Sequence, residues 1–123
     1  MKQMLPVTLI LTASMGLGLW MGWQFLRRAH SNPIHIGFHL ILGVVGLEAM
    51  VMLMRGALDG QAAGAGAWGK AAALMLGLAV ISGFATSVVA RRWSRQTGGA
   101  VLATHSVLAS VGFVMFLAWA VSL

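Results

Sequence analysis

Four apolar runs, each long enough to cross a membrane, constrain this chain more than any other feature of its sequence. They cover about residues 5–25, 33–54, 71–90 and 99–123. A transmembrane helix needs about 20 mostly apolar residues to cross the hydrocarbon core of a bilayer. The sequence therefore predicts an all-α fold, with residues 1–123 forming one four-span domain: an integral membrane four-helix bundle.

The composition excludes several classes of protein. Of the 123 residues, 59% are hydrophobic and only 8% are charged, which is too apolar for a soluble domain of this size. The short segments between the runs leave no room for a separate soluble catalytic module. The chain has no cysteine, which excludes disulfides, thiolate metal sites and covalently attached c-type haem.

The basic residues predict how the chain lies in the membrane. Two turns, between runs one and two and between runs three and four, hold Arg27, Arg28, Arg91, Arg92 and Arg95. By the positive-inside rule, both arginine turns face the cytoplasm of a bacterial-type inner membrane and both termini face outward, although Lys2 opposes this. The net charge of +6 is thus a topology signal, with no nucleic-acid partner implied. The Gly- and Ala-rich segment Gly56 to Gly69 is predicted to be an exposed outer loop.

The two halves of the chain resemble each other. Arg27-Arg28 is followed by the segment His39 to Gly46, and Arg91-Arg92 is followed by the segment His105 to Gly112. In each segment His comes first and Gly follows seven residues later. Gly18 and Gly22 precede their arginine pair by the same count as Ser82 and Thr86. This pattern predicts a duplicated helical hairpin with a two-residue insertion in the second copy, so that runs two and four run the same way and face each other.

His39 and His105 are the strongest candidates for a functional site. An imidazole inside a membrane is costly, so two at equal depth suggest a shared ligand. At about 1.5 Å per residue, each lies roughly 9 Å into its run, in the cytoplasmic third. Gly46 and Gly112 lie on the same helix faces as the two histidines. We predict a slot for a flat macrocycle, with His39 and His105 as the two axial ligands of one haem b near the cytoplasmic face.

Further polar residues are assigned around this site. His35 lies one turn nearer the arginine turn, where it and Arg28, Arg91 and Arg92 could pair with haem propionates. His30 is expected to be a solvent-facing turn residue. Glu48 lies on the opposite face of its helix, about 10 Å from the outer surface by helix rise. Two interpretations of Glu48 stay open: a hydrogen bond to Thr8 or Thr12, or a proton or quinone contact.

A family resemblance points the same way. The stretch Gly83-Phe84-Ala85-Thr86-Ser87-Val88-Val89-Ala90-Arg91-Arg92, continued through His105 to Gly112, resembles the helix-Arg-helix-His pattern of cytochrome b561-type membrane proteins. The resemblance covers about half of the chain and, more weakly, the other half through the repeat. It implies a bis-His haem b bundle for electron transfer with quinone or a larger redox complex, rather than a stand-alone enzyme. Fuller members bind two haems, whereas the outer half of this chain has no histidine.

Alternatives from other classes remain. A (bacterio)chlorophyll also takes an axial His, and a bundle without a cofactor could be an accessory subunit of a membrane complex, with a partner subunit or a second copy. A Cu(I) transporter is another alternative, suggested by the thioethers of Met50, Met52 and Met54, but these lie far along the helix from its histidines. Arg28-Ala29-His30-Ser31-Asn32 resembles the opening motif of small glutathione-dependent membrane enzymes; that family has a Glu where Pro33-Ile34-His35 follows here.

Overall fold

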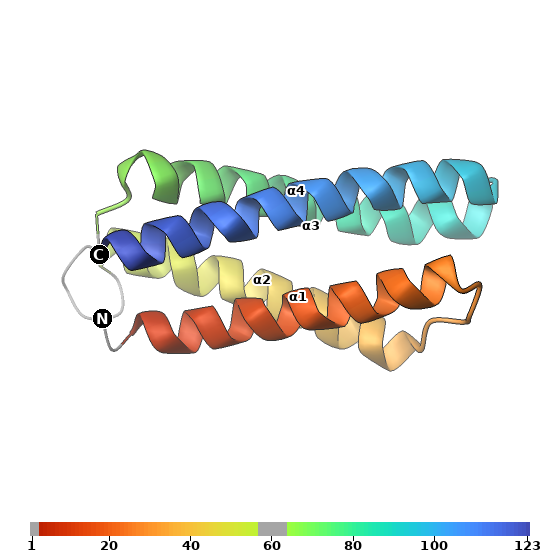
Figure 1. The fold of residues 1–123 in the computed structure, drawn as a ribbon, viewed down its shortest axis with the longest axis horizontal. Coiled ribbons are helices and arrows are strands. Elements are labelled where there is room, and N and C mark those ends of the chain that lie inside the picture. Colours follow the sequence, from red (N-terminus) through yellow and green to blue (C-terminus); the bar gives the residue numbers. More distant parts are fainter. Residues whose placement is uncertain (1–2, 57–63) are drawn as a thin grey trace.

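A computed structural model describes residues 3–56 and 64–123, and these residues form a bundle of four helices. The helices are α1 (Met4–Leu26), α2 (Pro33–Arg55), α3 (Gly66–Arg92) and α4 (Arg95–Ser122). They run up and down, with α1 packed along α2 and α3 packed along α4 (Figure 1). All four are long and apolar enough to cross a membrane. The predicted all-α membrane bundle is confirmed, and the chain is an integral membrane protein.

The helices extend beyond the apolar runs at several ends. α3 begins at Gly66, so the prediction of a loop as far as Gly69 is wrong for its last four residues. Gly69 is buried because the indole of Trp119 packs against it: a Cβ there would lie 3.0 Å from Trp119 Nε1. Most of the remaining predicted loop, residues 57–63 with Asp59, lies outside the described residues. Lys2 lies outside them as well.

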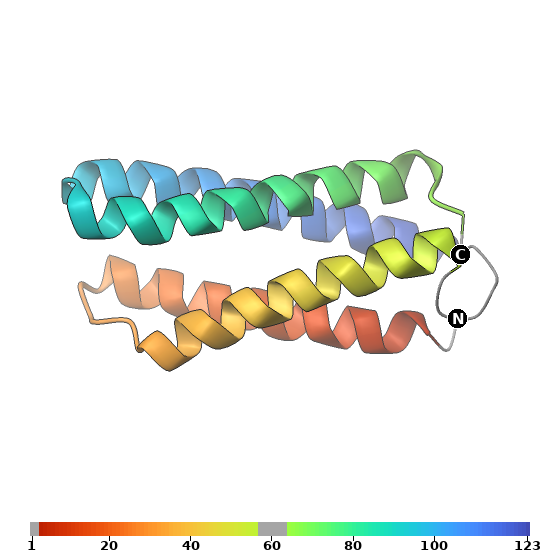
Figure 2. The ribbon, with the colours of Figure 1, turned by 180° about the vertical axis from the view of Figure 1, so that it is seen from behind.

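Capping residues set where α2 and α4 begin at the arginine turns. The Asn32 side chain accepts a hydrogen bond of 2.9 Å from the Ile34 amide, and Pro33 occupies the first helical position. The Ser94 hydroxyl accepts one of 3.2 Å from the Thr97 amide. Both turns lie at one end of the bundle, here called the arginine end. The start of α1 and the end of α4 lie at the opposite end, here called the terminal end (Figures 1 and 2).

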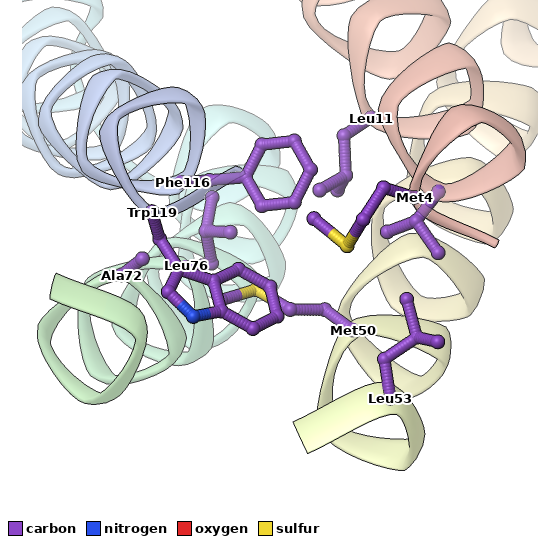
Figure 3. Close-up of a cluster of buried hydrophobic side chains, with 9 residues drawn as sticks. Met4, Leu11, Met50, Leu53, Ala72, Leu76, Phe116 and Trp119 are labelled. Carbon is purple, nitrogen blue, oxygen red and sulfur yellow. The ribbon is translucent and has the colours of Figure 1, made fainter. Parts of the chain in front are cut away.

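The apolar core of the bundle lies toward the terminal end. Phe116 and Met50 are fully buried and Trp119 is 2% exposed. Figure 3 shows side chains from all four helices pointing into this cluster, which consists of Met4, Val7, Leu11, Met50, Leu53, Ala72, Leu76, Phe116 and Trp119. Large interlocking side chains fill this half of the bundle. The two hairpins are therefore held together mainly away from the histidines.

The buried positions repeat between the two hairpins. Each buried residue of α1 has a buried counterpart 65 positions later in α3; for example, position 4 corresponds to position 69. Each buried residue of α2 has a buried counterpart 66 positions later in α4; for example, position 46 corresponds to position 112. The pairs are Met4 and Gly69, Val7 and Ala72, Leu11 and Leu76, Ser14 and Ala79, Gly46 and Gly112, Met50 and Phe116, and Leu53 and Trp119. The hairpin repeat is confirmed, but its register differs by one residue in the first helix: Gly18 corresponds to Gly83 and not to Ser82.

Gly46 and Gly112 serve the packing within each hairpin. A Cβ on Gly46 would meet the Leu11 side chain, and a Cβ on Gly112 would lie 3.0 Å from both Leu76 Cγ and the Leu76 backbone nitrogen. The absence of a side chain therefore lets each helix pair approach closely. These two glycines do not line the space beside the histidines, contrary to the slot predicted for them.

Replacing Gly112 with alanine should destabilise the bundle. The new methyl group would meet Leu76 backbone as well as side chain, so α3 and α4 must separate slightly. Overpacking of this kind costs about 1–3 kcal/mol, against a gain of at most about 1 kcal/mol in helix propensity. Reversible unfolding in detergent, followed by circular dichroism, measures the change. Gly77→Ala is the control, because a Cβ at Gly77 meets nothing within 4 Å; equal stability of the two variants would contradict the packing role.

Candidate functional site

A cavity of about 680 Å³ lies between the two hairpins on the arginine side of the core. Its lining comes from all four helices and is mostly apolar. Leu11 and Leu76 belong both to the core cluster and to the lining, so they mark the boundary between the packed half and the hollow half. Small residues make the space, among them Gly18, Gly22, Gly43, Gly83, Gly99 and Ala109. This volume is in the range of sites for cofactor-sized ligands.

His39 and His105 meet in this cavity. Their ring centroids are 6.0 Å apart and their planes are nearly perpendicular, at 89°. The two rings come from α2 and α4, which run in the same direction. Among the described residues, contacts join α1 with α2, α2 with α3, α3 with α4 and α4 with α1, but not α2 with α4. The two helices that carry the histidines therefore lie diagonally opposite each other in the bundle. They face each other across it, as the repeat predicts, but they are not direct neighbours. The imidazoles approach each other across the centre of the bundle.

Hydrogen bonds within the first hairpin fix the ring of His39. Its Nδ1 lies 2.8 Å from the backbone carbonyl oxygen of Ser14. A carbonyl can only accept, so Nδ1 carries the proton and donates. The Ser14 hydroxyl donates in return to the carbonyl oxygen of His39, at 3.1 Å. In the neutral imidazole this tautomer leaves Nε2 unprotonated, with a lone pair available to a ligand.

The second hairpin holds His105 in the same way. Nδ1 of His105 donates to the backbone carbonyl oxygen of Ala79, at 2.8 Å. The hydroxyl of Ser82 lies 3.2 Å from this Nδ1 and itself donates to the Ala79 carbonyl at 3.0 Å. Ala79 is the counterpart of Ser14 in the repeat. Both histidines are thus oriented by a carbonyl of their own hairpin, and both keep Nε2 free.

Two glycines make room for the rings. A Cβ on Gly18 would lie 2.9 Å from Cε1 of His39, and a Cβ on Gly83 would lie 3.1 Å from Cε1 of His105. The sequence repeat matched Gly18 with Ser82, so neither glycine was predicted as a site residue. Their match could have been found by aligning the first helix of each hairpin separately, because a shift of 65 pairs Gly18 with Gly83, whereas the histidines are 66 positions apart.

The donor set suits a metal that brings most of its own ligands. A metal–imidazole bond is about 2.0–2.1 Å long and the ring centre lies about 1.1 Å behind the nitrogen, so opposite axial imidazoles place their centroids about 6.4 Å apart. The observed 6.0 Å is close to this value. Within residues 3–56 and 64–123, no group of three or more His, Cys, Asp or Glu side chains could hold a bare ion. Haem iron, with four porphyrin nitrogens, needs only two axial ligands.

The comparisons with known proteins add no family to this picture. No family model, no curated protein and no solved structure matches the chain.

The other predicted ligand-binding residues lie around the cavity rather than in its lining. Arg28, Arg91 and Arg92 are exposed at the arginine end. His35 is half-buried and is not among the lining residues; its Nδ1 has no hydrogen-bond partner within the described parts of the chain. A propionate-binding role for these four residues stays a prediction. His30 is exposed in its turn, as expected.

Arg95 was not predicted as a site residue, yet its guanidinium contacts a residue of the cavity lining, Phe25. Its guanidinium donates to the carbonyl oxygen of Phe25 at 2.9 Å and stacks 4.6 Å from the centroid of the Phe25 ring. That ring lines the cavity. Arg95 therefore links the two hairpins at the arginine end, and its remaining N–H donors are available to an anionic group there.

Glu48 lies outside the site. It is on the exposed face of α2 and does not line the cavity. A proton or quinone contact of Glu48 stays a prediction. Thr8, one of its suggested partners, donates its hydroxyl to the Met4 carbonyl within α1 at 2.8 Å, and Thr12 is exposed on α1.

Proposed function

We propose that this protein is a membrane b-type cytochrome that binds one bis-His haem, with His39 and His105 as axial ligands. The observation that carries the proposal is the ring pair, 6.0 Å apart, with each Nδ1 hydrogen-bonded to a carbonyl of its own hairpin. Metal-bound histidines usually donate their second ring N–H to a carbonyl or carboxylate, which fixes the tautomer and raises the basicity of the ligating nitrogen. The loose resemblance to cytochrome b561-type proteins agrees with this proposal.

The chain would supply ligation, orientation and a dry surrounding, while the haem supplies one-electron chemistry when bound. Ser14 and Ala79 hold the two imidazoles. Leu11, Leu76 and the core behind them exclude water from the terminal side of the site. Arg95, which contacts the lining residue Phe25, would hold a carboxylate at the arginine end, with Arg28, Arg91 and Arg92 as further candidates. The arginine turns favour a haem near the cytoplasmic face of a bacterial-type inner membrane.

The surroundings of the cavity favour an electron partner inside the membrane. Leu19, Trp23 and Phe84 line the cavity and are nevertheless 67%, 54% and 52% exposed, so the cavity is open to the surface of the bundle. The cavity thus reaches the surface that faces lipid. A lipid-soluble carrier such as a quinone, or a subunit of a larger redox complex, could approach a bound macrocycle from that side. We propose electron transfer with one of these as the role of the protein.

An absorption spectrum of the protein purified from its native membrane tests the proposal. A Soret band and sharp α and β bands after dithionite reduction would support a bis-His haem. Red or near-infrared pigment bands would favour the alternative proposal, a (bacterio)chlorophyll-binding subunit, in which each pigment molecule usually takes one axial His. A colourless protein that also fails to bind added haemin would overturn the proposal and favour an accessory subunit without a cofactor.

A further inference from the structure

A stripe of exposed residues runs along α2 on the side away from the cavity. It consists of Phe38, Ile41, Val45, Glu48, Met52 and Arg55, all exposed, and is here called the α2 stripe. The spacing alternates between three and four residues. Such a heptad pattern keeps one narrow face of a helix toward a partner helix that runs nearly parallel to it. α2 lies on the near side of the molecule in Figure 2.

Glu48 makes this face unsuitable for contact with lipid alone. By helix rise its Cα lies about 10 Å from that of Arg55 and about 22 Å from that of Pro33, well inside the membrane-spanning length. Ionisable residues within spanning helices almost always face a bundle interior or pair with one another. At the equivalent position of α4, 66 residues later, stands Val114, which is 63% exposed. One hairpin therefore carries an ordinary lipid-facing residue where the other carries a carboxyl group.

We propose that the α2 stripe binds a second copy of this chain, with the two Glu48 carboxyl groups hydrogen-bonded to each other across a two-fold axis. Two copies insert in the same direction, because the same arginine turns orient both. Their α2 helices are then parallel, and a residue on the axis meets its own counterpart at the same depth. A carboxyl group is both donor and acceptor when protonated, so it is complementary to itself. Val45 and Met52 pack on either side of the pair.

Cross-linking through single cysteines tests this interface, since the natural chain has no cysteine. Val45→Cys, one turn from Glu48, should form a disulfide-linked dimer in native membranes on mild oxidation, because facing Cβ atoms of such a pair come within reach. Val111→Cys is the matched control: it is the counterpart of Val45 on α4, with 39% exposure against 44%. Equal cross-linking at both positions, none at either, or cross-linking of Val45→Cys to a protein of another mass would overturn the proposal.

Substitution of the carboxyl group tests its part in the dimer. Glu48→Val, which installs the residue found at position 114, should weaken dimerisation about three- to thirtyfold, as expected for loss of a hydrogen bond between spanning helices. Glu48→Gln keeps donor and acceptor and should dimerise within a few-fold of the natural chain. Förster transfer between labelled copies in vesicles measures both, and the helical circular dichroism of each variant checks its fold. Undiminished dimerisation of Glu48→Val would refute the carboxyl pair.

Discussion

His39→Ala and His105→Ala are each expected to abolish the bis-His haem spectrum. Either change removes one of the two imidazoles whose rings lie 6.0 Å apart in the cavity, and leaves at most one axial ligand. Loss of a group that merely orients a metal ligand typically costs about 10–100-fold in affinity, and loss of the ligand itself should cost more. The two variants should behave alike, because each Nδ1 donates to a backbone carbonyl of its own hairpin at the same distance, 2.8 Å.

Reduced-minus-oxidised spectra of the purified variants, together with haem content per chain, measure this effect. His30→Ala serves as the control, since His30 is exposed in its turn and away from the cavity lining. It should retain the full spectrum. If both ligand variants keep the spectrum of the natural protein, then a haem is bound elsewhere or not through these residues, and the assignment of the site is wrong.

Gly18→Ala and Gly83→Ala should weaken cofactor binding while leaving the bundle folded. The added methyl group would lie 2.9 Å from Cε1 of His39 in the first variant and 3.1 Å from Cε1 of His105 in the second. Each ring must then shift, which strains its hydrogen bond to the Ser14 or Ala79 carbonyl. We expect a loss of about 10–100-fold in haem affinity, the usual effect of removing the partner that orients a ligating histidine.

Titration with haemin and the position of the α band report this change. Gly16→Ala is the matched control in α1, because a Cβ at Gly16 meets nothing within 4 Å. It should bind as tightly as the natural chain, with a slight gain in helix stability. A Gly18→Ala protein with undiminished affinity would show that His39 does not need its observed ring position to bind the cofactor.

The helices could be predicted from the sequence because hydropathy and length alone decide which segments span a membrane. The register of the repeat could not, because the arginine pairs are not equivalent. Arg27 and Arg28 follow the end of α1 in a turn of six residues, 27–32, whereas Arg91 and Arg92 are the last residues of α3, before a turn of two, 93–94. An alignment on arginines therefore shifts the first helix of the second hairpin by one residue and misses the match of Gly18 with Gly83.

The histidine pair could be predicted from the repeat, but the arrangement of helices and side chains around it could not. Periodicity tells which residues share a face of one helix, and says nothing about whether two helices are neighbours or diagonal partners. Gly46 does share the His39 side of α2, yet Leu11 covers it within the hairpin. Arg95 is separated by 70 positions from Phe25, so only the folded chain brings its guanidinium onto that ring. Glu48 was rightly placed opposite His39, but which side of α2 faces outward depends on all four helices.

Within residues 3–56 and 64–123, every hydrogen bond to the ring of His39 or His105 comes from the same helix pair: from Ser14 for His39, and from Ala79 and Ser82 for His105. Each hairpin therefore holds its own imidazole in a fixed orientation. If the two hairpins move apart or together, the distance between the rings changes, but neither ring rotates relative to its hairpin. A ligand bound by both imidazoles would join the two hairpins toward the arginine end, where few side chains pack between them. The rigidity of that end should then rise on loading, while the opposite end stays as it was.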